Sequence, residues 1–215
     1  MHLNAHSYFS LRYGTLSPKQ LVREAQRRGV TVLALTDINN TSAAFPFVQA
    51  CRKAEIRPVL GIEFRHEGRF RYLGIARNRE GWRELCLHLS QYLETGEMEY
   101  RAPSWDNVWA IYRKLPVPVE QLADYEFVGI RPGEVNALYS SHLKHHTDRL
   151  VSFAPVTFLD DEGRKVHLLL QAIEQNTVLG KVDRKRCAAR DKTFLSPGLI
   201  RETFSAYPAI IANTE

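Results

Sequence analysis

Side chains of the kinds that carry chemistry stand in a few short segments of this 215-residue sequence. His6 lies in the opening segment, Asp37 directly follows the apolar run Val30–Thr36, and Glu63 lies near the end of the run Arg57–Phe64. Imidazole and carboxylate groups are the usual carriers of acid–base chemistry and of metal coordination. Each also has an ordinary structural role, as a hydrogen-bonded histidine, a turn or helix cap, or a strand-end ion pair. On the residues present, the structural roles are favoured over coordination.

The sequence predicts alternating strands and helices that would position these side chains. A short strand is expected at the start of the chain, and Ser17-Pro18-Lys19-Gln20 has the features of a helix start with a capping box. The nearly continuous apolar run Val30–Thr36 predicts a strand buried on both faces, as in a parallel sheet. Further strands are expected at Arg57–Phe64, Phe70–Ala76, Val108–Tyr112, Phe127–Ile130 and Leu150–Val156. Further helices are expected around Trp82–Tyr92 and at Val119–Tyr125, Gly133–Leu138, Gly163–Gln175 and Pro197–Tyr207.

Six or seven strands alternating with helices favour a parallel α/β architecture, closed or nearly so. In such folds, functional residues gather in the loops at the C-terminal edge of the strands. The positions to examine are therefore the loops Asn4–Ser10, Asp37–Thr41 and Ala154–Thr157, together with Glu63 and Arg71.

The bulk composition is that of a globular protein, and one domain spanning residues 1–215 is expected. With 44% hydrophobic and 25% charged residues, the composition argues against disorder. No apolar run approaches the about 20 residues that cross a bilayer, and the N-terminus lacks the pattern of a signal peptide. A cytoplasmic protein without membrane contact is therefore expected. Cys51, Cys86 and Cys187 are widely spaced and are interpreted as reduced thiols.

The net charge of +5 is compatible with work near nucleic acid but decides little by itself. The basic residues are scattered, with one concentration at Lys181–Arg190, which is interpreted as a solvated connecting segment. His142, His145 and His146 lie close together in the sequence, but their spacing matches no metal site, and they are interpreted as surface histidines.

Three segments resemble the motifs of the polymerase-and-histidinol-phosphatase (PHP) family, and their order and spacing along the chain also fit that family. His2–Ser10 resembles the opening motif His-x-His-x-x-x-Ser, Ala34–Asn40 resembles Ala-Leu-Thr-Asp-His-Gly-Asn, and Arg57–Glu63 resembles Lys-Pro-Ile-x-Gly-x-Glu. The segment Leu73–Leu85 is similar to the polymerase branch of the family, the N-terminal PHP domain of bacterial DNA polymerase III alpha subunits. Weaker similarity returns around His167. The resemblance implies a distorted, mostly parallel (β/α)7-type barrel.

In the family, histidine and carboxylate side chains at the strand ends hold divalent ions that generate hydroxide and stabilise phosphate charge during hydrolysis. Carried over by position, this resemblance makes His6, Asp37 and Glu63 remnants of the metal site. The positions at which a family ligand is lost are Asn4, Ile38, Arg71, Pro155 and Thr157. We therefore expect no functional metal site, no cofactor and no catalytic residue in this domain.

The resemblance implies a part of a longer chain that is a DNA-directed DNA polymerase, a nucleotidyltransferase of DNA replication. The present domain would be an inactive scaffold that packs beside the palm and thumb and meets DNA only through the full-length enzyme. The alternative is a stand-alone metal-dependent phosphoesterase or exonuclease of the PHP family, with zinc or manganese as its cofactor. A plain α/β binding module without a replication role is the least favoured interpretation.

Without metal, Asp37 and Glu63 would repel each other in a partly buried pocket unless a cation or hydrogen-bond donors compensate. Arg71 stands where the resemblance places a family histidine, and its guanidinium suits carboxylate pairing. Our hypothesis is that Arg71 replaces the metal by pairing with Glu63, Asp37 or both. The other possibility is an arginine that faces solvent on a hairpin strand, and the sequence leaves both open.

Overall fold

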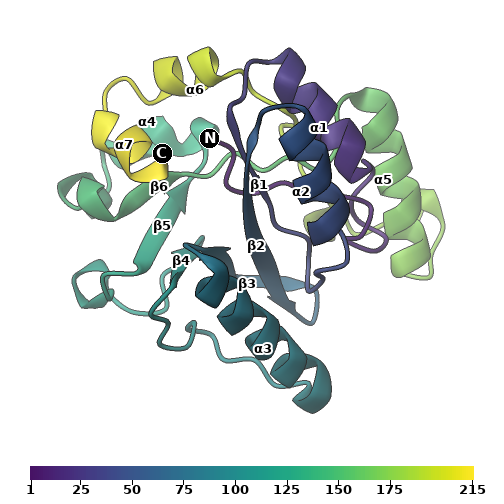
Figure 1. Ribbon diagram of the computed structural model, residues 1–215, viewed down its shortest axis with the longest axis horizontal. Coiled ribbons are helices and arrows are strands. Elements are labelled where there is room, and N and C mark those ends of the chain that lie inside the picture. Colours follow the sequence, from purple (N-terminus) through teal and green to yellow (C-terminus); the bar gives the residue numbers. More distant parts are fainter.

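The computed structural model describes residues 1–215 and is built on a six-stranded sheet that curls into a half-barrel (Figure 1). The strands lie side by side in chain order: β1 (Val32–Leu35), β2 (Arg57–His66), β3 (Arg69–Ala76), β4 (Val108–Tyr112), β5 (Glu126–Ile130) and β6 (Leu150–Ser152). The pairs β1–β2, β4–β5 and β5–β6 are parallel, while β3 is antiparallel to both of its neighbours. The predicted α/β fold, a distorted and mostly parallel barrel, is confirmed.

The N-terminal segment connects the two edges of the curled sheet. On the β1 side, the amide of Thr36 donates to the carbonyl of Ala5 at 2.9 Å. On the other side, the amide of His6 donates to the carbonyl of Val156, also at 2.9 Å. The strand expected at the start of the chain is therefore an extended segment that forms isolated parallel bridges. It takes the place of a further strand and brings the loop after β6 close to β1.

Helices lie around the sheet. They are α1 (Pro18–Arg27), α2 (Ala44–Lys53), α3 (Arg79–Thr95), α4 (Val135–Leu138), α5 (Asp161–Glu174), α6 (Pro197–Thr203) and α7 (Pro208–Thr214). Of these, α2, α3 and α7 pack on the strands of the sheet, and α1 packs on α2. The predicted capping box at the start of α1 is present, because the Ser17 hydroxyl accepts from the amide of Gln20 and the Gln20 side chain accepts from the amide of Ser17. No helix combines the length and apolarity needed to cross a membrane.

Three predicted elements are shorter than expected. The region Val119–Tyr125 holds only the 3-10 turn Val119–Gln121, and the strand expected from Leu150 ends at Ser152. The last predicted helix, Pro197–Tyr207, ends at Thr203 as α6. The next helix, α7, is separate and begins at Pro208, which disfavours helical backbone at the residue before it. These shortened elements leave loops around the sheet where continuous helices and strands were expected.

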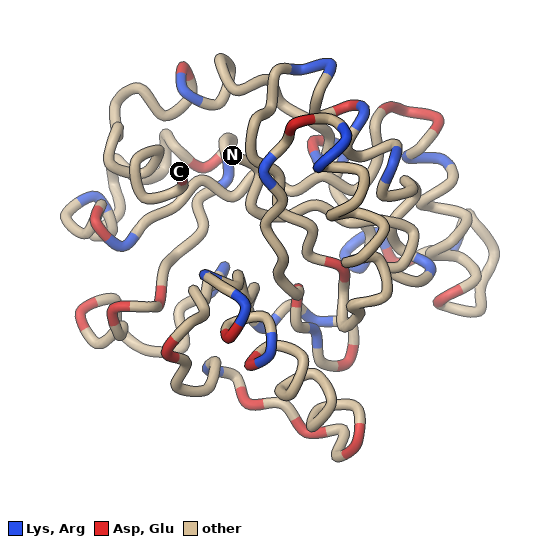
Figure 2. The backbone as a smooth tube through the Cα atoms, viewed as in Figure 1, with Lys and Arg blue, Asp and Glu red and all other residues tan.

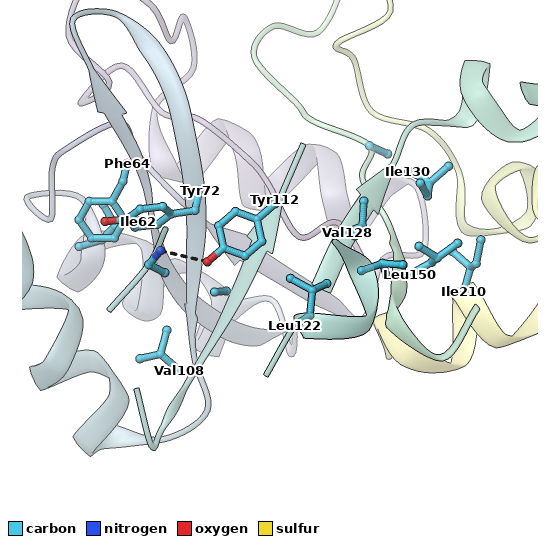
Figure 3. Packing of buried hydrophobic residues seen from close by; sticks show 14 of the residues in the cluster. Ile62, Phe64, Tyr72, Val108, Tyr112, Leu122, Val128, Ile130, Leu150 and Ile210 are labelled. Atoms are coloured by element: carbon cyan, nitrogen blue, oxygen red, sulfur yellow. Dashed lines mark hydrogen bonds between the residues drawn. The ribbon is translucent and has the colours of Figure 1, made fainter. Parts of the chain in front are cut away.

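The largest apolar cluster covers the outer face of the sheet beneath α3 and continues toward α7 (Figure 3). Phe64, Tyr72, Tyr112 and Phe204 are its largest fully buried side chains. Because side chains alternate along a strand, Ile62 and Phe64 of β2 point into this cluster while Glu63 between them points to the barrel interior. The outer core therefore determines the direction of the carboxylate.

The loop that follows His6 is folded back tightly. The amide of Tyr8 donates to the carbonyl of Leu16 at 2.8 Å, and the amide of Gly14 donates to the carbonyl of Ser10 at 3.0 Å. A Cβ atom placed on Gly14 would lie only 1.9 Å from the carbonyl oxygen of Ser7. That neighbour is backbone, so it cannot move aside as a flexible side chain could.

We expect Gly14→Ala to lower the free energy of unfolding by about 2 kcal/mol or more, because the methyl group displaces the backbone at Ser7. The matched control is Gly198→Ala in α6, where no atom other than those of the adjoining residues and the helix backbone lies within 4 Å of the new Cβ. Alanine there should leave stability unchanged or raise it by about 0.5 kcal/mol. Urea unfolding of the three proteins measures both values, and equal midpoints would contradict the close approach of Gly14 to Ser7.

Candidate functional site at the C-terminal edge of the barrel

His6, Asp37 and Glu63 meet at the C-terminal edge of the barrel, as predicted. All three are buried. His6 Nε2 lies 2.9 Å from Glu63 Oε2, and the amide of Glu63 donates to the carbonyl of Asp37 at 3.2 Å. The ends of β1 and β2 and the N-terminal segment thus deliver an imidazole and two carboxylates to one place.

Both carboxylate oxygens of Glu63 are engaged by protein groups. Asn4 Nδ2 donates to Oε2 at 2.7 Å, and Arg65 Nε donates to Oε1 at 2.5 Å. The guanidinium of Arg65 also lies 4.2 Å from the centre of the Tyr13 ring, and its side chain is only 13% exposed. Burial opposes ionisation of Glu63, but the charge of Arg65 and the contact with His6 outweigh it and hold the pKa of Glu63 well below its usual value.

The imidazole of His6 is held on both sides. Its Nε2 faces Glu63, and its Nδ1 lies 3.1 Å from the hydroxyl oxygen of Thr157. A neutral ring satisfies both contacts when Nε2–H donates to the carboxylate and Nδ1 accepts from the hydroxyl. Thr157 is thus a hydrogen-bond partner of His6 at a position where the family motif would supply a metal ligand.

Asp37 anchors the loop that follows His6. One carboxylate oxygen accepts from the amide of Ser7 at 2.7 Å and from the hydroxyl of Ser10 at 2.6 Å, and the other accepts from the hydroxyl of Ser7 at 2.6 Å. Burial raises the pKa of Asp37, and the hydrogen bonds from the two serines oppose that rise without cancelling it. The Asp37 carboxylate therefore holds the loop Ser7–Ser10 in place through these three hydrogen bonds.

The remaining predicted positions are packed rather than open. Ile38 contacts the small apolar cluster of Tyr13 and Phe158, and Pro155 is buried in the loop after β6. The side-chain oxygen of Asn4 is buried without a hydrogen-bond partner. The nitrogen of that amide, however, binds Glu63 directly.

The imidazole nitrogens and carboxylate oxygens of this site are already used within the protein. Glu63 and Asp37 have both oxygens hydrogen-bonded, His6 has both nitrogens in contact, and the Arg65 guanidinium lies among them. No group of three or more His, Cys, Asp or Glu side chains is arranged to hold a metal ion. The residues present therefore do not fit a centre of several divalent ions of the kind that the family motifs imply.

The hypothesis that Arg71 pairs with Glu63 or Asp37 is wrong. Its guanidinium lies over the ring of Tyr100 at 5.7 Å, and its Nε is buried without a hydrogen-bond partner. The physical reason is a bulge, since Arg65 pairs with Phe70 while its neighbour Phe64 pairs with Tyr72, which leaves Arg71 as the extra residue on β3.

Arg65 takes the role that was expected of Arg71, and the sequence analysis missed it. The signal was present, because residues two apart on a strand share a face and Arg65 stands two positions after Glu63. Tyr13, which packs under the Arg65 guanidinium, and Lys192, whose Nζ lies 3.2 Å from the Tyr13 hydroxyl, had no signal of this kind. Their contacts come from loops whose course the sequence does not reveal.

His167 of α5 lies behind the site and holds the backbone at Tyr13 and at Ala188 in place. Its Nδ1 donates to the carbonyl of Tyr13 at 2.7 Å, and its Nε2 accepts from the amide of Ala188 at 2.8 Å. The backbone amide can only donate, so the ring is neutral with its proton on Nδ1. Burial is the main cause that lowers the pKa of His167 to about 4.

Comparison with known proteins identifies the family. The PHP domain profile matches residues 2–152, and the chain belongs to the PHP domain family. The chain is 34% identical over 115 residues to the error-prone DNA polymerase of Symbiobacterium thermophilum, an alignment that covers 50% of this chain and 11% of that protein. It is 23% identical over 252 residues to the DNA polymerase III subunit alpha of Halalkalibacterium halodurans, covering 100% of this chain and 22% of that protein.

The corresponding subunit of Vibrio cholerae is 23% identical over 193 residues, covering 81% of this chain and 16% of that protein. The chain therefore spans between 11% and 22% of the length of these three relatives. The predicted resemblance to the N-terminal PHP domain of DNA polymerase III alpha subunits is confirmed as a homology.

We expect Arg65→Ala to lower the free energy of unfolding by about 3–5 kcal/mol, because it leaves the buried Glu63 carboxylate without its counter-charge. The control is Arg71→Ala, which removes the same side chain from the neighbouring strand and should cost about 1 kcal/mol or less. Denaturant unfolding at neutral pH measures both. Equal losses, or a larger loss for the Arg71 variant, would show that Glu63 does not depend on Arg65.

We expect His167 to make the protein less stable in acid. Its folded-state pKa of about 4 lies below the usual 6.5, so its contribution is complete above pH 6.5 and is lost as the pH falls toward 4. The loss attributable to this residue is about 3 kcal/mol across that window. Unfolding of the wild type and of His167→Gln at several pH values measures the difference, and parallel pH profiles would refute it.

Proposed function

We propose that the chain is a non-catalytic structural domain of a DNA polymerase chain of the DNA polymerase III alpha type, with a degenerate PHP metal site. Homology to polymerase alpha chains supports the polymerase assignment. Polymerisation would be carried out by other parts of such a chain, and the domain would pack beside its palm and thumb. Its expected location is the cytoplasm, and its contact with DNA is through the full-length enzyme.

The observation that carries the scaffold role is the ion pair between Arg65 and Glu63 inside the pocket of the family motifs. A fixed guanidinium in hydrogen-bond contact with the central carboxylate supplies the positive charge that a divalent ion would otherwise supply. Asn4 and Thr157 complete the arrangement by binding Glu63 and His6. The negative charge of Glu63 is balanced by Arg65 of the same chain, so the fold would not need a metal ion for its stability.

The alternative function is a metal-dependent phosphoesterase or exonuclease that uses zinc or manganese. It would require Glu63 to release Arg65, Asp37 to release both serines, and His6 to release Thr157. Each release leaves a buried donor or charge unpaired, at a cost of about 1–3 kcal/mol for a neutral group and more for a charged one. No contact in the site favours this alternative over the scaffold.

We expect protein purified without chelator to contain less than stoichiometric zinc and manganese, and its melting temperature to be the same in EDTA and in added Mn²⁺. Hydrolysis of a phosphomonoester and of single-stranded DNA should stay at background, because the network leaves no ligand set for a metal-bound nucleophile. Elemental analysis, thermal melting and both assays are run beside a PHP enzyme that has a complete ligand set. Stoichiometric metal together with chelator-sensitive turnover would overturn the proposal in favour of the phosphoesterase.

A further inference from the structure

A cleft of about 790 Å³ opens directly above the Arg65–Tyr13 stack. One side is the turn of the β2–β3 hairpin, and the other is the segment between α5 and α6. The cationic residues that line it are Arg65, Arg69, Arg131, Arg184, Lys185, Arg186 and Lys192. Figure 2 shows blue Lys and Arg segments at the hairpin end of β2 and β3. The basic segment Lys181–Arg190 is therefore not only a solvated connection, since part of it forms a wall of this cleft.

The cleft carries a large excess of positive charge. Its only acidic lining residues are Glu67 and Asp183, and the Asp183 carboxylate is used to accept from the amide of Lys185 at 2.9 Å. Arg65 is neutralised by Glu63 beneath it. None of the other six cations has a carboxylate within ion-pair distance, although many arginines elsewhere in the protein do.

Unpaired cations from three separate elements are held around one space. Arg69 comes from β3, Arg131 follows the end of β5, and Arg184 and Arg186 belong to a 3-10 turn between α5 and α6. The Nε of Arg131 is buried and has no hydrogen-bond partner. Like charges gathered in this way repel one another, and a bound anion with several oxygen acceptors would relieve that repulsion. Phosphate groups meet this requirement, since arginine binds them through parallel N–H donors.

We propose that this cleft binds closely spaced phosphate groups without any metal ion. The shared chemistry is that of a diphosphate, and it can come from free inorganic pyrophosphate or from the backbone of single-stranded DNA. The proposal deepens the scaffold function and rests on it, because the Arg65–Glu63 pair forms the floor of the cleft. It assigns the domain a binding role at a site where hydrolysis has no ligand set.

Binding of a fluorescent twelve-residue thymidine oligonucleotide to the 215-residue chain is measured by anisotropy in EDTA, and inorganic pyrophosphate is titrated separately by calorimetry. The test variant is Arg184→Ala with Arg186→Ala, two exposed residues of the 3-10 turn. The matched control is Lys19→Ala with Arg23→Ala on the exposed face of α1, which changes the net charge equally. Thermal melting checks that each variant is folded, and Lys185→Glu serves as a second test variant.

We expect the test variant to bind its ligand about tenfold more weakly at low salt, while the control stays within about twofold of the wild type. For the oligonucleotide, the slope of log K against log salt should be smaller by about 1.4. Saturable binding of pyrophosphate in the calorimeter identifies free phosphates as the source, and oligonucleotide binding without pyrophosphate binding identifies the DNA backbone. Absence of binding to both probes, or equal weakening in the control, would overturn the proposal. Chelator-sensitive hydrolysis would instead contradict the scaffold function, so the two failures are distinguishable.

Discussion

A buried carboxylate needs a positive partner or several hydrogen-bond donors, and in this domain the positive partner of Glu63 is Arg65. Glu63 is turned into the barrel because its neighbours on β2 are required by the outer core. An isolated carboxylate in that position would lose solvation worth several kcal/mol. In a PHP domain with a full ligand set, bound cations would meet this need. Here the guanidinium two residues further along the same strand meets it, and this guanidinium itself lies over the ring of Tyr13.

The rest of the site is organised around this pair. Asn4 and His6 both reach Glu63 from the N-terminal segment, so the carboxylate helps to hold that segment between the two edges of the sheet. Asp37 fastens the loop that follows. His167 fixes the backbone at Tyr13, and thereby the ring on which Arg65 lies. The polar residues at the positions of the family motifs thus hold the N-terminal segment against the sheet. The Arg65–Glu63 pair forms the floor of the basic cleft, and the unpaired arginines and lysines form its walls.

The fold and the meeting of the motif residues could be predicted from the sequence, because apolar periodicity places the strands and parallel strands end at a common edge. The counter-charge could not be assigned correctly in the same way. Arg71 was chosen from its position in the family motif, but the bulge opposite Arg65 turns it toward Tyr100. Strand alternation pointed to Arg65, whereas Lys192 reaches the site through a loop that leaves no periodic pattern.

The central claim is that Arg65 replaces a bound cation as the partner of Glu63, and a double-mutant cycle tests it most directly. Glu63→Gln, Arg65→Met and the double variant are unfolded by urea at neutral pH, with and without Mn²⁺. The account predicts a coupling energy of about 2 kcal/mol or more, because the second substitution removes a charge that the first has already left unpaired. It also predicts no stabilisation of the wild type by Mn²⁺. Additive effects within about 0.5 kcal/mol, or stabilisation of the wild type by the metal, would contradict it.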